Sequence, residues 1–372
     1  MKKILLLGSI VSPCPPDKQG GTERVAYYQA KHLAIHNLPL IFIGAKGTKN
    51  NFKAELIFEK EQKINLILKN IEFIEIGGGT GFGNQEDSLK TDLSQIEASR
   101  KIRIEQVNLA LIQKLMIERK DDYQIILNNL RGETALIPLA NLLGKKIVNV
   151  MHLNIFPELA QIFKNYQTNI ITISQAQEEN FPDLNYLSTI YNPINPTLFP
   201  YNNKPKNYAL MISTIGYHKN QKDTILACQK AEIPLILAGK IRDIEYFEKE
   251  IKPLINNTNV VYKGELNFQE KIELYRNAKV FLFPIKWQEP FGLVLIEALS
   301  CGTPVIAYPH GGPKEIIENN MNGYLVENVE QMADKIKIID QIDRLSCRKD
   351  VEKRFSETII GKQYFETINS LI

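Results

Sequence analysis

Cysteine, long apolar runs and strong net charge are all scarce in this chain of 372 residues. The four cysteines, Cys14, Cys228, Cys301 and Cys347, form no Cys-x-x-Cys pair. They therefore predict neither a zinc site nor a disulfide scaffold, and a reducing cytoplasm fits them. No apolar run reaches the roughly 18 to 20 residues that a membrane span needs. The net charge of +3 is too small to indicate nucleic acid, although a local basic face could favour anionic ligands or a peripheral contact with membrane head groups.

The chain begins with a short apolar run that could be mistaken for a signal peptide. Pro13 and Pro15 bracket Cys14 where the small residues of a cleavage site would be expected. We therefore interpret Lys3–Gly8 as the first buried strand of a parallel sheet.

Short apolar segments alternate with helical segments along most of the chain, which predicts an α/β protein with parallel sheets covered by helices on both faces. The expected strands of the first half are Lys3–Gly8, Leu38–Ile43, Ile71–Ile76, Tyr123–Asn128, Lys146–Met151 and Asn169–Ser174. Its expected helices are Glu23–His36, Asp92–Arg119 and Thr134–Leu143, and Lys46–Ser88 is expected to be an irregular insertion. The expected strands of the second half are Tyr208–Thr214, Pro234–Ala238, Val260–Gly264, Val280–Pro284 and Pro304–Tyr308.

Proline and asparagine cluster between Tyr191 and Lys206, which indicates a linker between two domains. We predict an amino-terminal domain over residues 1–194, a linker over 195–206 and a carboxy-terminal domain over 207–355. The last segment, 356–372, has an apolar face at helical spacing, and we assign it to the amino-terminal domain.

The segment Trp287–Ala298 carries the strongest chemical signal. Pro290 marks a helix start, and the backbone N–H groups of Phe291, Gly292 and Leu293 would be unpaired donors of its first turn. Such a helix end attracts phosphate, and Gly292 would let a ligand approach the backbone closely.

Glu297 lies in the apolar run Leu293–Leu299, about two turns inside this helix. An unpaired carboxylate there would cost several kcal/mol, and the vicinal hydroxyls of a ribose or a hexose would remove that cost. The alternative is a glutamate on the exposed stripe of the helix.

These residues resemble the retaining glycosyltransferase family 4, which has the GT-B architecture. Its Glu-x7-Glu pattern is matched by Glu289 and Glu297, with Pro-Phe-Gly between them. Three further family patterns follow, at Ala298–Ile306, Gly311–Glu315 and Asn322–Val326. The resemblance implies two Rossmann-like parallel-sheet domains that face each other across a cleft. It also implies that Glu289 holds hydroxyls of the transferred sugar and that Glu297 holds the ribose hydroxyls.

The resemblance extends more weakly to the amino-terminal half. Gly20 and Gly21 lie at the mouth of a helix, and His152 ends a predicted strand. A glycine pair alone is often only a turn, and a lone histidine is often structural. The resemblance implies that the glycine loop faces the donor phosphates and that His152 lines the cleft near the transferred sugar.

One position departs from the family pattern. Where the family has an arginine followed five residues later by a lysine, this chain has Thr214 and Lys219. Both cations normally hold the diphosphate, and a charge-assisted hydrogen bond contributes roughly 1.5–3 kcal/mol. His218 could supply a second positive charge if protonated, or it could be exposed without a role.

The resemblance implies a hexosyltransferase that takes a UDP- or GDP-sugar and no cofactor, and that passes the sugar with retention to an unidentified hydroxyl of a glycan, a lipid-linked molecule or a small molecule. The absence of Asp-x-Asp agrees with transfer without metal. Two alternatives are a nucleotide-sugar epimerase of the same architecture and a catalytically weak sugar-nucleotide-binding protein. An NAD-dependent enzyme is disfavoured, because Gly-x-Gly-x-x-Gly is absent after the first strand.

Overall fold

The computed structural model describes residues 2–16, 20–78 and 94–372. The chain divides into two compact units. The first comprises Met1–Ile173, Glu178–Ile190 and Ile360–Ile372, and the second comprises Ser174–Gln177 and Tyr191–Ile359. Each unit has its own sheet.

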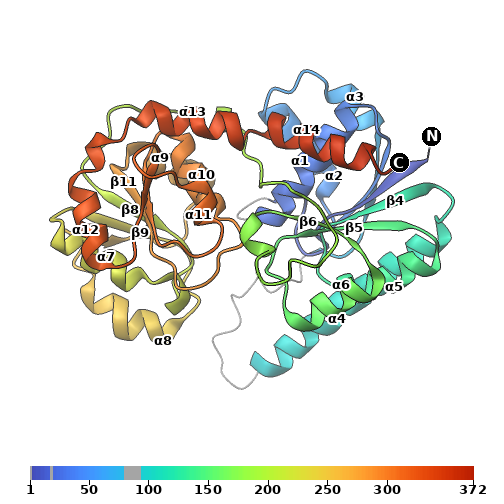
Figure 1. The fold of residues 1–372 in the computed structure, drawn as a ribbon, viewed down its shortest axis with the longest axis horizontal. Helices are drawn as coiled ribbons and strands as arrows, with labels where there is room; N and C mark the ends of the chain where they lie inside the picture. The colour runs from blue at the N-terminus through green and yellow to red at the C-terminus, as the bar shows by residue number, and fades with distance from the viewer. Residues whose placement is uncertain (1, 17–19, 79–93) are drawn as a thin grey trace. The chain divides into compact units, whose positions relative to one another are not determined.

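The sheet of the first unit has seven strands in the order β3-β2-β1-β4-β5-β6-β7, and every strand pair is parallel. The strands are β1 (Lys3–Leu7), β2 (Leu40–Gly44), β3 (Ile71–Glu75), β4 (Tyr123–Asn128), β5 (Lys146–Met151), β6 (Asn169–Thr172) and β7 (Tyr186–Thr189). The helices are α1 (Gly21–Ile35), α2 (Thr48–Phe58), α3 (Ile64–Lys69), α4 (Ser94–Glu118), α5 (Glu133–Leu142), α6 (Pro157–Tyr166) and α14 (Glu357–Asn369). In Figure 1, α5 and α6 lie on one face of this sheet, and α1 and α14 lie on the other.

Continuous apolar runs form the central strands because both faces of the sheet are covered. All of Ile4, Leu5, Leu6 and Leu7 are at most 2% exposed. The core under one face joins these strands to the helices of that face, and includes Leu5, Leu7, Ile41, Ile126, Ile112, Met116, Leu136 and Phe163.

The sheet of the second unit has six parallel strands in the order β10-β9-β8-β11-β12-β13. The strands are β8 (Ala209–Ile212), β9 (Leu235–Ala238), β10 (Val260–Tyr262), β11 (Val280–Phe283), β12 (Val305–Ala307) and β13 (Gly323–Leu325). The helices are α7 (Gln221–Lys230), α8 (Ile244–Tyr246), α9 (Phe268–Asn277), α10 (Leu293–Ser300), α11 (Pro313–Ile316), α12 (Val329–Lys337) and α13 (Arg344–Arg354).

In both sheets the strand order reverses beside one central strand. In the first unit β1 lies between β2 and β4, and in the second β8 lies between β9 and β11. Loops that leave such neighbouring strands diverge to opposite faces, and the crevice at their carboxyl ends is where open α/β sheets bind ligands. The loops after β8 and β11, and those after β1 and β4, are therefore where a site is expected.

The last helix, α14, packs in the first unit through its residues beyond 359. A Cβ on Gly361 would lie 2.1 Å from Cγ of His32 on α1, so the helices approach closely at this glycine. One turn along, the rings of His36 and Phe365 stack with centroids 4.2 Å apart.

Several sequence-based expectations need correction. Residues 48–69 of the expected insertion are not irregular but form α2 and α3, whose buried Phe52, Leu56 and Ile67 are spaced too sparsely to stand out in a polar sequence. The strand expected at Ile71–Ile76 is present as β3. Residues 79–88 of the expected insertion lie outside the described part. The strands β7 and β13 were missed because β7 is only half-buried along its length and β13 begins with a glycine, so neither forms a clear apolar run.

All four cysteines are buried and free. Within the described ranges, no helix is both long and apolar enough to cross a membrane.

Candidate functional site

The loop after β8 is held in a fixed shape by its own backbone and by one buried glutamine. Ile215 pairs with the loop after β9: its N–H donates to the carbonyl of Lys240 at 2.9 Å. The amide of Gln221 donates to Oγ of Ser213 at 2.9 Å and to the carbonyl of Thr214 at 3.0 Å. Because Gln221 is fully buried, these bonds fix the turn that carries Lys219.

Lys219 meets Glu289 across the gap between the loops after β8 and β11. Its Nζ lies 2.8 Å from Oε2 of Glu289, and the two side chains are 15% and 16% exposed. The indole Nε1 of Trp287 donates to the same oxygen at 3.0 Å. Lys219 also lies over the Trp287 ring, 5.0 Å from its centroid. The second carboxylate oxygen, Oε1, accepts no hydrogen bond from the part of the chain that the structure describes, so it is the oxygen available to a ligand.

Two glycines hold the backbone of Glu289. Its N–H donates to the carbonyl of His310 at 3.2 Å, and its carbonyl accepts from the N–H of Gly312 at 2.8 Å. Gly311 has a positive φ of 77°, and a Cβ there would lie 2.3 Å from the carbonyl oxygen of Glu289. Only glycine fits this close approach, which explains the Gly-Gly pair at 311–312.

The helix that follows, α10, begins at Leu293 and not at Pro290 as the sequence analysis expected. Gly292 caps it with a left-handed φ of 107°, a conformation that glycine adopts without strain and that lets the chain turn sharply into the helix. The N–H groups of Leu293 and Val294 lie in the first turn, where a helix offers no internal acceptor. The side chain of Phe291 is buried between the rings of Tyr191 and Phe355, so it has only its backbone to offer a ligand.

Glu297 is the fifth residue of α10, little more than one turn from its start, and it has two partners in the chain. Its Oε1 accepts from Nζ of Lys271 at 2.7 Å, and its Oε2 accepts from the hydroxyl of Tyr275 at 3.0 Å. Both donors come from α9, four residues apart and therefore on one face of that helix. The carboxylate is thus neither unpaired nor on an exposed stripe, contrary to both sequence-based alternatives. Each oxygen still has a lone pair for a further donor.

His218, the alternative second cation, lies beside Trp287 with ring centroids 6.0 Å apart. Its partial burial, and then the charge of Lys219, lower its pKa below the ordinary histidine value. A lowered pKa favours the neutral imidazole at pH 7, which argues against His218 as a replacement for the arginine absent at Thr214.

The other predicted site residues lie in the first unit. Gly20 precedes α1 with an extended φ of 178°, and Gly21 is the first residue of that helix. His152 follows β5, and its Nε2 lies 2.9 Å from Oδ1 of Asn129. Burial, and then the positive charge of Arg131, lower the pKa of His152 to about 4, so its imidazole is neutral at pH 7.

Glu315, in the family pattern that includes Gly311 and Gly312, anchors a neighbouring segment. Its carboxylate accepts from the N–H groups of Gln175 and Ala176, both at 2.9 Å, and from the hydroxyl of Tyr191 at 3.1 Å. All these residues belong to the second unit.

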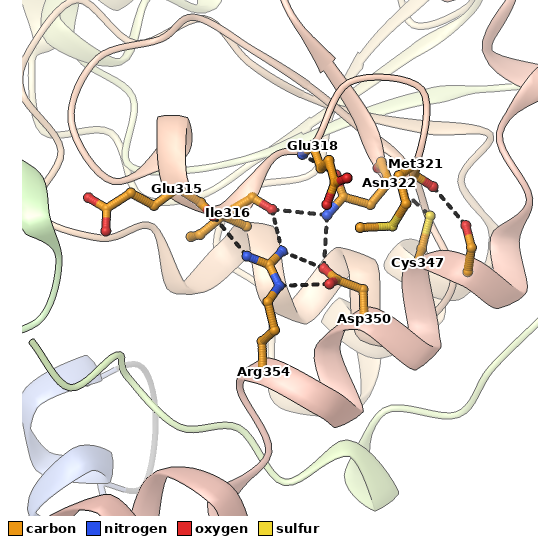
Figure 2. A network of polar contacts seen from close by, with 9 residues as sticks. Glu315, Ile316, Glu318, Met321, Asn322, Cys347, Asp350 and Arg354 are labelled. Carbon is orange, nitrogen blue, oxygen red and sulfur yellow. Dashed lines mark hydrogen bonds and ion pairs between the residues drawn. The ribbon is translucent and has the colours of Figure 1, made fainter.

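The network in Figure 2 fixes the helix that carries Glu315. Arg354 donates to the carbonyls of Glu315 and Ile316 at 2.8 and 2.7 Å, and it also pairs with Asp350. Asn322 donates to the carbonyl of Ile316 and to Asp350, both at 2.9 Å. The asparagine of the Asn-Gly pair at 322–323 therefore has a structural role.

The structure thus brings Lys219, Glu289, Gly292 and Leu293 to one edge of the second sheet, with Glu297 one turn further along α10. Sequence reasoning did not single out the partners Trp287, Lys271, Tyr275 and Asn129. The four-residue spacing of Lys271 and Tyr275 on an expected helix was a usable signal, whereas nothing in the sequence pairs Asn129 with His152. Among the described residues, no group of three or more His, Cys, Asp or Glu side chains could hold a metal ion.

Part of this chain is similar in sequence to known glycosyltransferases. Residues 198–356 match the family model of glycosyl transferases group 1. A glycosyltransferase of Methanocaldococcus jannaschii is 29% identical over 54% of this chain and 58% of its own length. A mouse (Mus musculus) GDP-Man:Man(3)GlcNAc(2)-PP-Dol alpha-1,2-mannosyltransferase is 30% identical over 41% of this chain and 33% of its own length. The chain thus spans less than two thirds of each of these curated relatives.

Solved structures show the fold over the whole chain. Anabaena HepE, crystallised with UDP-glucose, has a TM-score of 0.69 at 19% identity and covers 100% of both chains. A glycosyltransferase of Rickettsia africae has the same TM-score and identity over 99% of both chains. The fold is therefore the GT-B fold, with two parallel-sheet α/β domains.

Proposed function

Because residues 198–356 match the family model of glycosyl transferases group 1, we propose that this chain is a glycosyltransferase that moves a hexosyl group from a UDP- or GDP-sugar to a hydroxyl acceptor. The observation that carries the proposal is the contact of Lys219, Trp287 and Glu289 beside the open first turn of α10. It places a cation, a carboxylate and backbone N–H donors at one sheet edge, which are the groups that a sugar diphosphate needs.

Each part of the donor has a partner in this arrangement. The diphosphate would meet Nζ of Lys219 and the N–H groups of Leu293 and Val294, because helix amino ends and ammonium groups both attract phosphate. Oε1 of Glu289 would accept hydroxyls of the sugar. Glu297, held on both oxygens by α9, would accept the ribose hydroxyls. The named ligands of relatives support the donor class: UDP-glucose for HepE and GDP-mannose in the name of the mouse enzyme.

In the proposed reaction the bond between the anomeric carbon and the diphosphate oxygen breaks, and the acceptor oxygen bonds to that carbon. The departing nucleoside diphosphate gains negative charge, which Lys219 and the start of α10 would stabilise without rearrangement. The proton of the acceptor hydroxyl leaves with the diphosphate or to water. Retention of configuration and membership of family 4 rest on the Glu289 and Glu297 pattern, and action without metal rests on the resemblance and on the absence of Asp-x-Asp.

The acceptor is expected to be a glycan, a lipid-linked molecule or a small molecule. A cytoplasmic location, with peripheral contact at the inner face of the membrane, stays a prediction from the sequence.

Two other functions use the same site. A nucleotide-sugar epimerase would bind the donor in the same way but return a changed sugar nucleotide without releasing the diphosphate. A binding protein with weak catalysis is favoured only by Thr214, which leaves Lys219 as the cation matched to the family pattern.

The chain contains a single tryptophan, and it touches Lys219 and Glu289 in the proposed donor site. Its fluorescence should therefore report binding directly. We would titrate the protein with UDP, GDP, ADP and their glucose and mannose conjugates, then follow diphosphate release with and without acceptor mixtures.

A uridine or guanosine diphosphate should change the fluorescence saturably. Lys219→Ala should weaken that response, whereas Lys286→Ala should not, because Lys286 lies over Tyr217 and contacts neither carboxylate. No saturable response to any nucleotide would overturn the proposal. Conversion of the sugar nucleotide without release would support the epimerase.

A further inference from the structure

In the first unit, His152, which follows β5, is hydrogen-bonded to one of two buried amides that pair with each other. Gln29 on α1 and Asn129 after β4 are 1% and 4% exposed. Nε2 of Gln29 donates to Oδ1 of Asn129 at 3.1 Å, and Nδ2 of Asn129 donates back to Oε1 of Gln29 at 2.7 Å. The same Oδ1 also lies 2.9 Å from Nε2 of His152.

A backbone carbonyl fixes which way the Asn129 amide points. Nδ2 of Asn129 also donates to the carbonyl oxygen of Leu7, at the end of β1, at 3.3 Å. A carbonyl oxygen can only accept, so the nitrogen must face Leu7. If the amide were turned over, two oxygens would face each other there, and a buried pair of this kind is unfavourable. Oδ1 must therefore face His152.

An oxygen that can only accept dictates where the proton of the imidazole lies. We propose that the Gln29–Asn129 amide pair is a positioning device, which holds His152 as the neutral tautomer with hydrogen on Nε2 and so presents Nδ1 as a hydrogen-bond acceptor. In a neutral imidazole one nitrogen donates and the other accepts. Asn129 takes the donor, and Nδ1 keeps its lone pair.

The surroundings of His152 keep the ring neutral. Burial and the positive charge of Arg131, beyond Asn129 in the same loop, lower the pKa of His152 to about 4. Arg131 is the charged group that acts on this ring. At neutral pH, His152 would therefore act neither as a cation for the diphosphate nor as a proton donor through Nδ1.

The ligand chemistry follows from this tautomer and rests on the proposed function. Nδ1 would accept a hydrogen bond from a hydroxyl of the acceptor, because a hydroxyl is the donor that an unprotonated imidazole nitrogen can bind. Asn129 bonds to His152, to Gln29 and to the carbonyl of Leu7, and Gln29 reaches His152 only through Asn129. Both are therefore positioning residues. His152 is the group expected to touch the substrate.

The test observes the tautomer of His152 directly and does not depend on catalytic activity. Ring nitrogens of the five histidines would be observed by long-range proton–nitrogen NMR in the 15N-histidine-labelled full chain, and His152→Gln would identify the signal of His152. Between pH 6 and 8 we expect a protonated Nε2 and an unprotonated Nδ1, with no titration. In Asn129→Leu the signal should change to a mixture of tautomers.

The neighbouring Asn128 provides a matched control. It is 1% exposed, and its amide bonds to Asn149 and to Leu130 rather than to His152. Asn128→Leu should therefore disturb the same sheet edge but leave the His152 signal unchanged. If Asn129→Leu does not fold, Gln29→Leu tests the same device, since it removes only the partner amide.

Two results would overturn the proposal: a wild-type His152 with hydrogen on Nδ1 or a charged ring at pH 7, or an unchanged tautomer in folded Asn129→Leu. If the proposed transfer reaction is also observed, that variant should lower turnover by about tenfold, the loss of one hydrogen bond, without altering the Trp287 response to UDP. Failure to detect any transfer would count against the proposed function and leave the tautomer result intact.

Discussion

Nζ of Lys219 lies 2.8 Å from Oε2 of Glu289, so the cation and the carboxylate of the candidate donor site are already paired in the protein alone. Both side chains are mostly removed from water. A diphosphate would have to share Lys219 with Glu289, and a sugar would have to bind the carboxylate from its open oxygen. The two carboxylates of the site therefore have different consequences when their charge is removed.

Glu289→Gln should reduce kcat by about a hundredfold, because it removes a charge beside the sugar whose own charge changes in the transition state. The affinity for the nucleoside diphosphate should stay the same or rise, since Lys219 is freed from its partner. Steady-state kinetics give kcat, and calorimetry with the nucleoside diphosphate gives its affinity, so the two effects are measured separately. A large loss of diphosphate affinity with normal kcat would show that Glu289 does not meet the sugar.

Glu297→Gln should chiefly raise the donor KM, by about tenfold, with a small change in kcat. It weakens acceptance of the ribose hydroxyls, and the ribose is remote from the bond that breaks, so the loss is shared by ground and transition states. Lys271→Met is the matched variant, because it removes the 2.7 Å partner of Glu297 and keeps the carboxylate. An effect confined to kcat would contradict this assignment.

Thr214→Arg should tighten donor binding, because the arginine fork can bind two phosphate oxygens at once. One such bond corresponds to about ten- to a hundredfold in affinity. Ordering the arginine side chain costs up to roughly 2 kcal/mol, which offsets part of this gain. The carbonyl of Thr214 is held by Gln221, so the backbone should keep its course. Calorimetry at matched salt measures the donor dissociation constant of the wild type and of the variant, with Thr214→Gln as the uncharged control. Equal or weaker binding in a folded variant would mean that another cation has replaced the arginine.

Turnover should survive removal of divalent metal. The charge of the leaving diphosphate would be met by Lys219 and the first turn of α10, and the sequence has no Asp-x-Asp. Initial rates with and without excess chelator check this. An enzyme that stops in chelator and recovers only when magnesium or manganese is restored would disprove the expectation.

Gly361→Ala should destabilise the first unit by roughly 1–3 kcal/mol, because the added Cβ would collide with the ring of His32 on α1. The better helix propensity of alanine offsets about 1 kcal/mol of this cost. Thermal denaturation measures the change, and Gln363→Ala is the control at an exposed position of the same helix. A variant as stable as the control would show that α1 and α14 can separate slightly without cost.

The sequence predicted the two parallel sheets because buried strands such as Ile4–Leu7 carry unbroken apolar runs. The sequence did not predict α2 and α3, whose few buried residues are diluted by lysine, asparagine and glutamate, nor the edge strands β7 and β13, which form no clear apolar run. Around the site, the position of Gly292 at a helix start followed from its neighbours. The exact start did not, because it depends on the left-handed backbone of Gly292 and on the bonds that tie Glu289 to Gly312.

Contacts between residues far apart in the chain could not be predicted from the sequence. Lys219 and Glu289 could be named individually, but their contact arises from the crossing of two loops 70 residues apart. Glu297 was expected to lack a partner because its neighbours along α10 are apolar, whereas its partners come from another helix. The Asn129 contact with His152 has the same origin.

The packing of Gly361 against His32 has a consequence for the order in which the chain folds. The second unit is complete once residue 359 has been synthesised, whereas the first still lacks Ile360–Ile372 at that moment. Domains generally fold as units during synthesis. The first unit therefore leaves the ribosome first but completes its fold last. The surface of α1 around His32 and His36 stays uncovered until the whole second unit has been translated.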